Sequence, residues 1–336
     1  MYRASNRQVI LVNRPLGIPQ ASDFALIQSE RPIPGAGQIR VRNLYLSVEP
    51  AMRGWVNAVG NYSEPVPLMA VMRSFAVGII DASNHADYPV GMHVTGLFGW
   101  QDYAVVDVSA VEQTLTDNGL PISTALGVLG INGVTAHYGL LEIGQPKPGE
   151  TVVVSTAAGA VGSCVGQIAK IKGCQTIGIA GGQNKVQMCL KRFKYDNAVN
   201  YKSTSFSSDL SKACQKGIDV YFDNVAGSIS DEVMKHLNVG ARIVICGTAS
   251  VSNWVPTPEG PRVERQLLVK RARIQGFVIF DHKDYYAKAR QELVEWIRSG
   301  TIHYEEDVLS GIESAPDAIA GLYRGENSGK RLIKLV

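Results

Sequence analysis

The stretch Thr151-Val-Val-Val-Ser155 decides the fold, together with the small residues Ala157, Gly159 and Gly162 that follow it. A short run of β-branched apolar residues is typical of a parallel strand buried on both faces. The small residues have the spacing of a Gly-x-Gly-x-x-Gly turn with alanine in the first position. Such a turn lets backbone approach a pyrophosphate and directs helix N-terminal N–H groups at its charge. The stretch predicts a dinucleotide-binding unit, although such turns also occur for packing alone.

The chain after residue 150 alternates strands with helical stretches. We expect strands at 151–155, 175–180, 197–201, 219–223, 241–246 and 273–280, most of them followed by a helix. This alternation predicts an α/β fold with a doubly wound parallel sheet covered on both faces, a Rossmann domain.

The first part of the chain has a different character. Short β segments are expected at 8–13, 24–28, 38–46, 76–83, 93–97 and 100–106, punctuated by Pro and Gly. Their irregular spacing predicts a partly open β-barrel. Residues 330–336 resemble one more strand, which could return to this first domain. We therefore expect one domain from 1–123 with 310–336, and the Rossmann domain at 124–309.

Composition excludes several classes of partner. A length of 336 residues fits two domains at roughly 150 residues each. A formal charge of +3, with both signs dispersed, does not favour nucleic acid or anionic lipid. We find no signal peptide and no span of about 20 mostly apolar residues. The five cysteines have no CxxC spacing, which argues against a zinc ribbon and disulfides. A soluble protein of the reducing cytoplasm is expected.

The second predicted strand bears on the choice of cofactor. NAD-specific sites place an Asp or Glu roughly 20 residues after the glycine motif, where it binds the ribose hydroxyls. Here that strand ends in Ile179-Ala-Gly-Gly-Gln183 without an acid. Lys185 follows directly, and Tyr201 ends the third strand. The pattern favours the 2′-phosphate of NADP(H), although Lys185 could be an ordinary solvated lysine.

Metal and hydrolytic chemistry have little support. A catalytic zinc needs about three Cys, His or acidic ligands, and the first 163 residues contain no cysteine. His85 and His93 fit surface positions better than ligand positions. No Gly-x-Ser-x-Gly elbow is present either. We therefore expect no metal site.

Several motifs, in order along the chain, resemble those of one family. They are Val48-Glu-Pro-Ala-Met-Arg-Gly54, Leu129-Gly-Ile-Asn-Gly-Val-Thr-Ala136, Gly149-Glu-Thr-Val-Val-Val154, Gly217-Ile-Asp-Val-Tyr-Phe-Asp-Asn-Val225, Ile245-Cys-Gly247, Gly276-Phe277 and Gly325-Glu-Asn-Ser-Gly-Lys330. Nearly end to end, the chain resembles the zinc-independent medium-chain dehydrogenase/reductases that use NADPH to reduce alkenal and enone double bonds. The curcumin-reductase branch is the most similar.

This resemblance implies a GroES-like catalytic domain closed by the C-terminal tail, an inserted nucleotide-binding domain and a homodimer. It also implies contacts with NADP(H) from Pro50, Thr135, Gly159, Ala160, Val161, Lys185, Tyr201, Asn224, Cys246, Phe277 and Asn327. The glycine turn adds Gly162 to these expected contacts. Asn224 and Cys246 also fall at the ends of the fourth and fifth strands, where such sheets bind ligands.

Two places depart from the family pattern. Ser252 stands where a tyrosine is usual, and a serine hydroxyl is shorter and less acidic. The stretch 68–74 carries Met and Arg in place of small polar residues. Both departures bear on substrate range. Tyr62 matches a tyrosine of the curcumin-reductase branch and is the candidate hydrogen-bond donor, with Ser252 a weaker catalytic candidate; Tyr62 could also be an ordinary loop residue.

The expected reaction is hydride transfer from NADPH to the β-carbon of an α,β-unsaturated ketone or aldehyde. A donor aimed at the carbonyl oxygen would stabilise the negative charge that develops there. Two alternatives remain open: an NADPH-dependent quinone reductase, and a catalytically weak NADPH-binding protein. The physiological substrate is not readable from the sequence.

Overall fold

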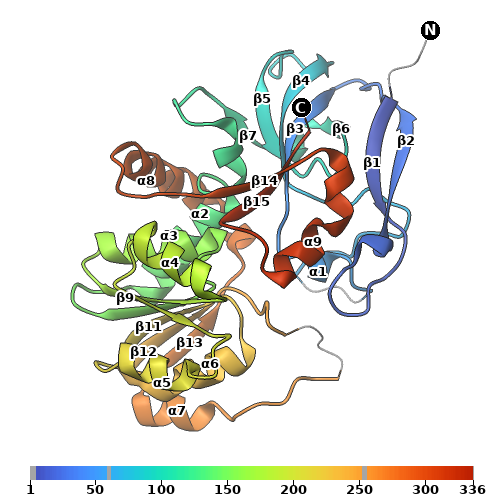
Figure 1. Ribbon diagram of the computed structural model, residues 1–336. Helices are drawn as coiled ribbons and strands as arrows, with labels where there is room; N and C mark the ends of the chain where they lie inside the picture. Colours follow the sequence, from blue (N-terminus) through green and yellow to red (C-terminus); the bar gives the residue numbers. More distant parts are fainter. Residues whose placement is uncertain (1–4, 59–61, 252–255, 336) are drawn as a thin grey trace. The chain divides into compact units, whose positions relative to one another are not determined.

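The computed structural model describes residues 5–58, 62–251 and 256–335 (Figure 1). The chain divides into two compact units. The first, here called the β unit, comprises residues 1–126 and 306–336. The second, the nucleotide unit, comprises residues 127–305.

The nucleotide unit contains a six-stranded parallel sheet in the order β10-β9-β8-β11-β12-β13. The chain starts at β8 in the middle, moves outward through β9 and β10, and then returns to the other side of β8 with β11. The switch point of the doubly wound fold therefore lies between β8 and β11. The strands are β8 (Thr151–Ser155), β9 (Gln175–Ala180), β10 (Asn197–Asn200), β11 (Ile218–Asp223), β12 (Leu237–Ile245) and β13 (Arg273–Gly276).

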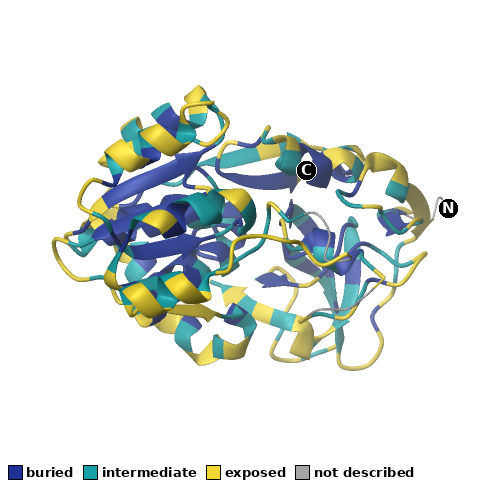
Figure 2. Cartoon of the chain, turned by 90° about the horizontal axis from the view of Figure 1, so that it is seen from below, coloured by how far each residue is buried: buried dark blue, intermediate teal, exposed yellow. Residues whose placement is uncertain are grey.

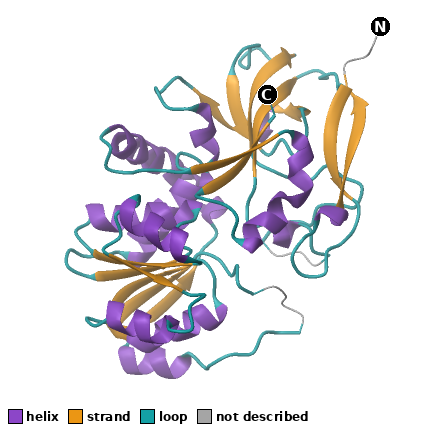
Figure 3. Cartoon of the chain, viewed as in Figure 1, coloured by secondary structure: helices purple, strands orange, loops and turns teal. Residues whose placement is uncertain are grey.

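Helices flank this sheet, as Figure 3 shows. Their polar faces are exposed while the central strands are buried, which Figure 2 displays by colour. The helical segments are α2 (Ile131–Tyr138), η4 (Gly139–Gly144), α3 (Ala160–Ile171), α4 (Gln183–Lys191), α5 (Phe206–Ala213), α6 (Gly227–Val233), η5 (Met234–His236), α7 (Glu264–Lys270), η6 (Ile279–Tyr285) and α8 (Tyr286–Arg298).

The packing of α3 against its neighbours explains its small residues. A Cβ atom at Gly166 would lie 2.1 Å from the Tyr195 ring, so only glycine admits this contact. The Tyr195 hydroxyl donates a 2.6 Å hydrogen bond to the Gly162 carbonyl. Val152, Val153 and Val154 of β8 are fully buried beneath, as expected for a strand covered on both faces.

The β unit is built on a seven-stranded sheet in the order β14-β15-β3-β4-β5-β7, with β6 paired to β3. A two-stranded ribbon, β1-β2, accompanies it. The elements are β1 (Ser5–Leu11), η1 (Ala21–Asp23), β2 (Phe24–Glu30), β3 (Gln38–Ser47), α1 (Met52–Trp55), β4 (Ala76–Ser83), β5 (His93–Gly96), β6 (Tyr103–Asp107), η2 (Val108–Ala110), β7 (Val111–Leu115), η3 (Ile122–Leu126), β14 (Glu306–Ser310), η7 (Ile312–Ser314), α9 (Ala315–Arg324) and β15 (Lys330–Lys334).

The C-terminal strand returns to the start of the chain, as its sequence suggests. β15 pairs antiparallel with β3, with Leu332 opposite Ser47. Lys330 Nζ lies 2.6 Å from Glu49 Oε1 and donates a second 2.6 Å bond to Ser47 Oγ. Both charged side chains are almost fully buried, and removing one partner of such a pair is strongly destabilising.

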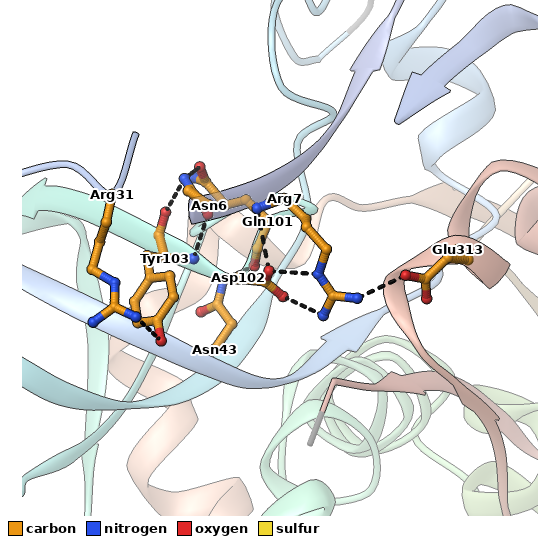
Figure 4. Close-up of polar contacts among 8 residues, drawn as sticks. All are labelled: Asn6, Arg7, Arg31, Asn43, Gln101, Asp102, Tyr103 and Glu313. Atoms are coloured by element: carbon orange, nitrogen blue, oxygen red, sulfur yellow. Dashed lines mark hydrogen bonds and ion pairs between the residues drawn. The ribbon is translucent and has the colours of Figure 1, made fainter. Parts of the chain in front are cut away.

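A polar network also ties β1 to the rest of the β unit (Figure 4). The Arg7 guanidinium donates two hydrogen bonds to the Asp102 carboxylate and a third to Glu313. The Asn6 amide exchanges hydrogen bonds with the Tyr103 backbone. Segments far apart in the sequence are joined here by side chains, a kind of contact that hydrophobic periodicity does not reveal.

Some elements differ from the sequence prediction. The strand expected at 100–106 begins only at Tyr103, because Trp100 is fully buried and its indole N–H donates to the Ser47 carbonyl. The strand expected at 273–280 ends at Gly276, where the chain turns into η6. The helices α2, α7 and α9 and the short strands β7 and β14 were not predicted; α2 lies in a Gly-rich stretch that looks unlike a helix.

Candidate cofactor and catalytic sites

Most of the predicted cofactor residues follow directly after strands of the parallel sheet. In the nucleotide unit, every strand carries one at or just after its carboxyl end: Gly159 after β8, Lys185 after β9, Tyr201 after β10, Asn224 after β11, Cys246 after β12 and Phe277 after β13. The carboxyl ends of parallel strands share one edge, which is where doubly wound sheets bind ligands. We call this edge the carboxyl edge.

The glycine turn at the carboxyl edge fits a phosphate. A Cβ atom at Gly162 would lie 2.3 Å from the Thr156 carbonyl oxygen, and one at Gly159 would lie 2.9 Å from Thr156 Cγ2. Thr156 itself has a φ of 54°, so the turn is tightly wound. Helix α3 begins at Ala160, with Val161 in its first turn and without a side-chain cap on Gly159. Its N-terminal N–H groups therefore suit a pyrophosphate, and the residues present fit a dinucleotide.

The ends of β9 and β10 form the neighbouring part of this edge. A Cβ atom at Gly181 would lie 2.9 Å from the Tyr201 ring, so the ring lies against the bare glycine backbone. Asn200 Oδ1 accepts hydrogen bonds from the backbone N–H groups of Gly182 and Lys202. Lys185 lies in the first turn of α4, half-buried. The sequence places no carboxylate at the end of β9, and this arrangement suits an added phosphate.

Asn224 and Ser155 connect the two strands at the switch point. The Asn224 backbone N–H donates a 2.8 Å bond to Ser155 Oγ, and its side-chain amide donates a 2.7 Å bond to the Ser155 carbonyl. On the next strand, burial and the charge of Asp223 raise the pKa of the Cys246 thiol to about 12. Cys246 therefore stays a neutral thiol near neutral pH and is not a nucleophile.

Thr135 and Phe277 belong to the other flank of the nucleotide unit. The Thr135 hydroxyl donates a 2.6 Å bond to the Ile131 carbonyl within α2. The Phe277 ring packs beside Tyr138, with ring centroids 5.7 Å apart, and against Gly139, where a Cβ would lie 2.7 Å away. These contacts bring α2 to the end of β13.

The β unit carries Pro50 and Asn327. The Pro50 carbonyl accepts a 3.0 Å hydrogen bond from the hydroxyl of Tyr323, and the Arg53 guanidinium lies 4.7 Å from the centre of that ring. Burial raises the pKa of Tyr323, and Arg53 opposes the shift. Asn327 is buried and donates to the Gly329 carbonyl. Tyr323 lies outside the family motifs and has no local sequence signal, whereas Arg53 lies within the motif at 48–54.

Tyr62 is 54% exposed on a loop of the β unit. Arg73 braces the residues that follow it: the guanidinium donates a 2.6 Å bond to Ser63 Oγ and a 2.9 Å bond to the Glu64 carbonyl. The same guanidinium lies 5.8 Å from the Trp55 ring centre. Arg73 belongs to the stretch 68–74 that departs from the family pattern. This stretch therefore contacts the loop that carries Tyr62, the candidate hydrogen-bond donor. Ser252 lies outside the described residues.

Across residues 5–58, 62–251 and 256–335, no group of three or more His, Cys, Asp or Glu side chains is arranged to hold a metal ion. None of the helices described there combines the length and apolar character that crossing a bilayer requires.

Comparisons with known proteins agree with this geometry. A family described as "N-terminal domain of oxidoreductase" matches residues 7–114, and one described as "Zinc-binding dehydrogenase" matches residues 160–295. The NADPH-dependent curcumin reductase of Escherichia coli is 41% identical over 98% of this chain and 97% of its own. The 2-alkenal reductase (NADP(+)-dependent) of Nicotiana tabacum is 37% identical over 98% and 97%. The crystal structure of CurA from Vibrio vulnificus in complex with NADPH superposes with a TM-score of 0.93, at 45% identity, covering 98% of this chain and 99% of that one.

A β unit completed by the C-terminal strand, together with a doubly wound unit whose glycine turn fits a phosphate, defines a dinucleotide-dependent oxidoreductase of the medium-chain type. The identities and coverage above narrow this class. The chain belongs to the medium-chain dehydrogenase/reductase family, in the branch of NADP-dependent curcumin, alkenal and prostaglandin reductases. The family predicted from the sequence motifs is confirmed.

Proposed function

We propose that this protein reduces the carbon–carbon double bond of α,β-unsaturated ketones or aldehydes with NADPH. The observation that carries the proposal is the carboxyl edge: a tight glycine turn that fits a phosphate, no carboxylate at the end of β9, and Lys185 in its place. End-to-end similarity to reductases named for curcumin and 2-alkenals supports the substrate class.

When bound, NADPH would supply a hydride for the β-carbon of the substrate, and negative charge would then develop on the carbonyl oxygen. The chain's own part is to orient the substrate and to stabilise that oxygen. We propose the Tyr62 hydroxyl as the hydrogen-bond donor, because it lies exposed on a braced loop of the β unit. A solvent proton completes the product at the α-carbon. Pro50, Thr135, Phe277 and Asn327 are proposed cofactor contacts alongside the residues of the carboxyl edge.

A substrate panel tests the proposal. NADPH oxidation is followed with a simple enone, a 2-alkenal and a simple quinone, and products are analysed for C=C against C=O reduction. We expect saturated ketone or aldehyde as product and faster turnover of the enone than of the quinone. Turnover of the quinone alone would establish the quinone-reductase alternative, and tight NADPH binding without any turnover would establish a binding protein.

We also propose that the reaction needs no zinc and proceeds in the cytoplasm. The donor set supports the first point, because the β unit contains no cysteine. The second rests on five free cysteines, as a reducing compartment would keep them. Metal analysis of active protein should find far less than one zinc per chain, and one zinc per chain would contradict this.

A homodimer is proposed through β13. This edge strand is exposed along its whole length, and Ile274, Leu268, Val269 and Val239 expose apolar side chains on and near it. An unprotected strand edge is a template for pairing with another strand, here that of a second copy. Light scattering should give twice the 36.3 kDa chain mass, and Ile274→Lys should shift the protein toward monomer.

A further inference from the structure

The fourth strand of the sheet, β11, ends in a carboxylate that is almost fully buried. Asp223 is 2% exposed. It accepts hydrogen bonds from Ser230 Oγ at 2.6 Å, Val225 N at 2.9 Å, Ala226 N at 3.0 Å, Tyr221 Oη at 3.0 Å and Ser155 Oγ at 3.3 Å. Among these donors in the described chain there is no lysine, arginine or histidine. Burying a charge is costly unless hydrogen bonds or a counter-ion compensate for the lost water. Here the compensation comes from five neutral donors.

Two of these contacts control the backbone beyond the strand. The N–H groups of Val225 and Ala226 converge on one oxygen of Asp223, and Ala226 has a φ of 58°, an unfavourable conformation for a non-glycine residue. The Asp223 carboxylate therefore fixes the path of the chain just after Asn224. A backbone held in a sparsely populated conformation at a strand end is a feature of functional sites.

Ser155 links the same carboxylate to Asn224 across the switch point. Its hydroxyl donates to Asp223 and accepts the Asn224 N–H, while its carbonyl accepts the Asn224 side-chain amide. The Asn224 nitrogens are thus committed to β8. Within the described residues, Asn224 Oδ1 accepts no hydrogen bond, so a half-buried acceptor remains at the carboxyl edge. Such an acceptor suits a hydroxyl or amide donor on the cofactor.

We propose that Asp223 is a positioning residue for cofactor binding, which acts through Ser155 to hold the Asn224 acceptor in place at the switch point. The inference rests on the proposed function, because it assumes that NADPH binds at the carboxyl edge. Asp223 does not itself touch the cofactor. Its part is to fix the orientation of Asn224 before binding, so that no ordering cost is incurred when the ligand arrives.

A double-mutant cycle tests this. Asp223→Ala removes both acceptor oxygens, and is made in the unaltered protein and in Asn224→Ala. NADPH affinity is measured by fluorescence titration and folding by thermal unfolding. We expect Asp223→Ala to weaken NADPH about tenfold in the unaltered protein and less than twofold in Asn224→Ala. Ser230→Ala is the matched control: it removes a hydrogen bond from the other oxygen of Asp223 and should leave NADPH affinity within twofold.

Two outcomes overturn the inference: an NADPH affinity unchanged in folded Asp223→Ala, or an equal loss in both backgrounds. If Asp223→Ala does not fold, Ser155→Ala in the same two backgrounds decides by the same criterion. Normal NADPH binding and enone turnover by the unaltered protein, together with either outcome, would leave the proposed function standing. A failure of the unaltered protein to bind NADPH would overturn both.

Discussion

The carboxyl edge of the nucleotide unit and the Tyr62 loop of the β unit both carry proposed site residues, but they are built differently. At the edge, strand ends and glycine backbone create the site, and Gly162 is buried so tightly that a methyl group has no room. In the loop, one guanidinium braces two neighbours of an exposed tyrosine. A site made of backbone tolerates little change, whereas a site made of side chains can vary with the substrate.

The largest effect is expected at the glycine turn. Gly162→Val places a Cβ 2.3 Å from the Thr156 carbonyl, a backbone atom that cannot move aside cheaply. We expect NADPH affinity to fall by more than roughly 100-fold, with a lower unfolding temperature. Gly260→Ala is the control, since its Cβ would meet nothing closer than 3.7 Å. Normal NADPH binding by folded Gly162→Val would show that the turn does not cradle phosphate.

Lys185 distinguishes the two dinucleotides at the same edge. Lys185→Ala should weaken NADPH roughly 30-fold and NADH less than threefold, because only NADPH has the 2′-phosphate that an ammonium would pair with. Lys191→Ala, at the far end of the same helix, should change neither. Binding of both cofactors is measured by fluorescence titration. Equal losses for NADPH and NADH in Lys185→Ala would refute the phosphate contact.

How far each region could be predicted follows from the same difference. The strand at 151–155 and the turn at Gly159 and Gly162 have local signals, because buried parallel strands and phosphate turns impose residue types on neighbouring positions. The pairing of Lys330 with Glu49 and the brace from Arg73 to Ser63 join side chains distant in sequence, and no local pattern encodes them. Asp223 stood within a quoted motif, yet its role depends on Ser155, which lies 68 residues earlier.

In the β unit, Tyr62→Phe removes the proposed donor and keeps the ring. Turnover of an enone should fall roughly tenfold, since one donor to a developing oxyanion is lost, while NADPH affinity stays within twofold. Tyr88→Phe, elsewhere in the β unit, should leave both quantities unchanged. Unaltered turnover in Tyr62→Phe would remove this hydroxyl from the mechanism and leave the loop without a chemical role.

The smallest effect is expected from Arg73, which acts on the reaction only through the loop. Arg73→Ser removes both hydrogen bonds to residues 63 and 64 and should lower turnover about threefold, with NADPH affinity unchanged. The decisive measurement is the double variant. If Arg73 only positions Tyr62, Arg73→Ser causes no further loss of turnover in Tyr62→Phe, because the group that it positions is already missing. A full threefold loss of turnover in both backgrounds would mean that Arg73 supports the β unit generally. The proposal that side chains of this loop position the Tyr62 hydroxyl would then be wrong.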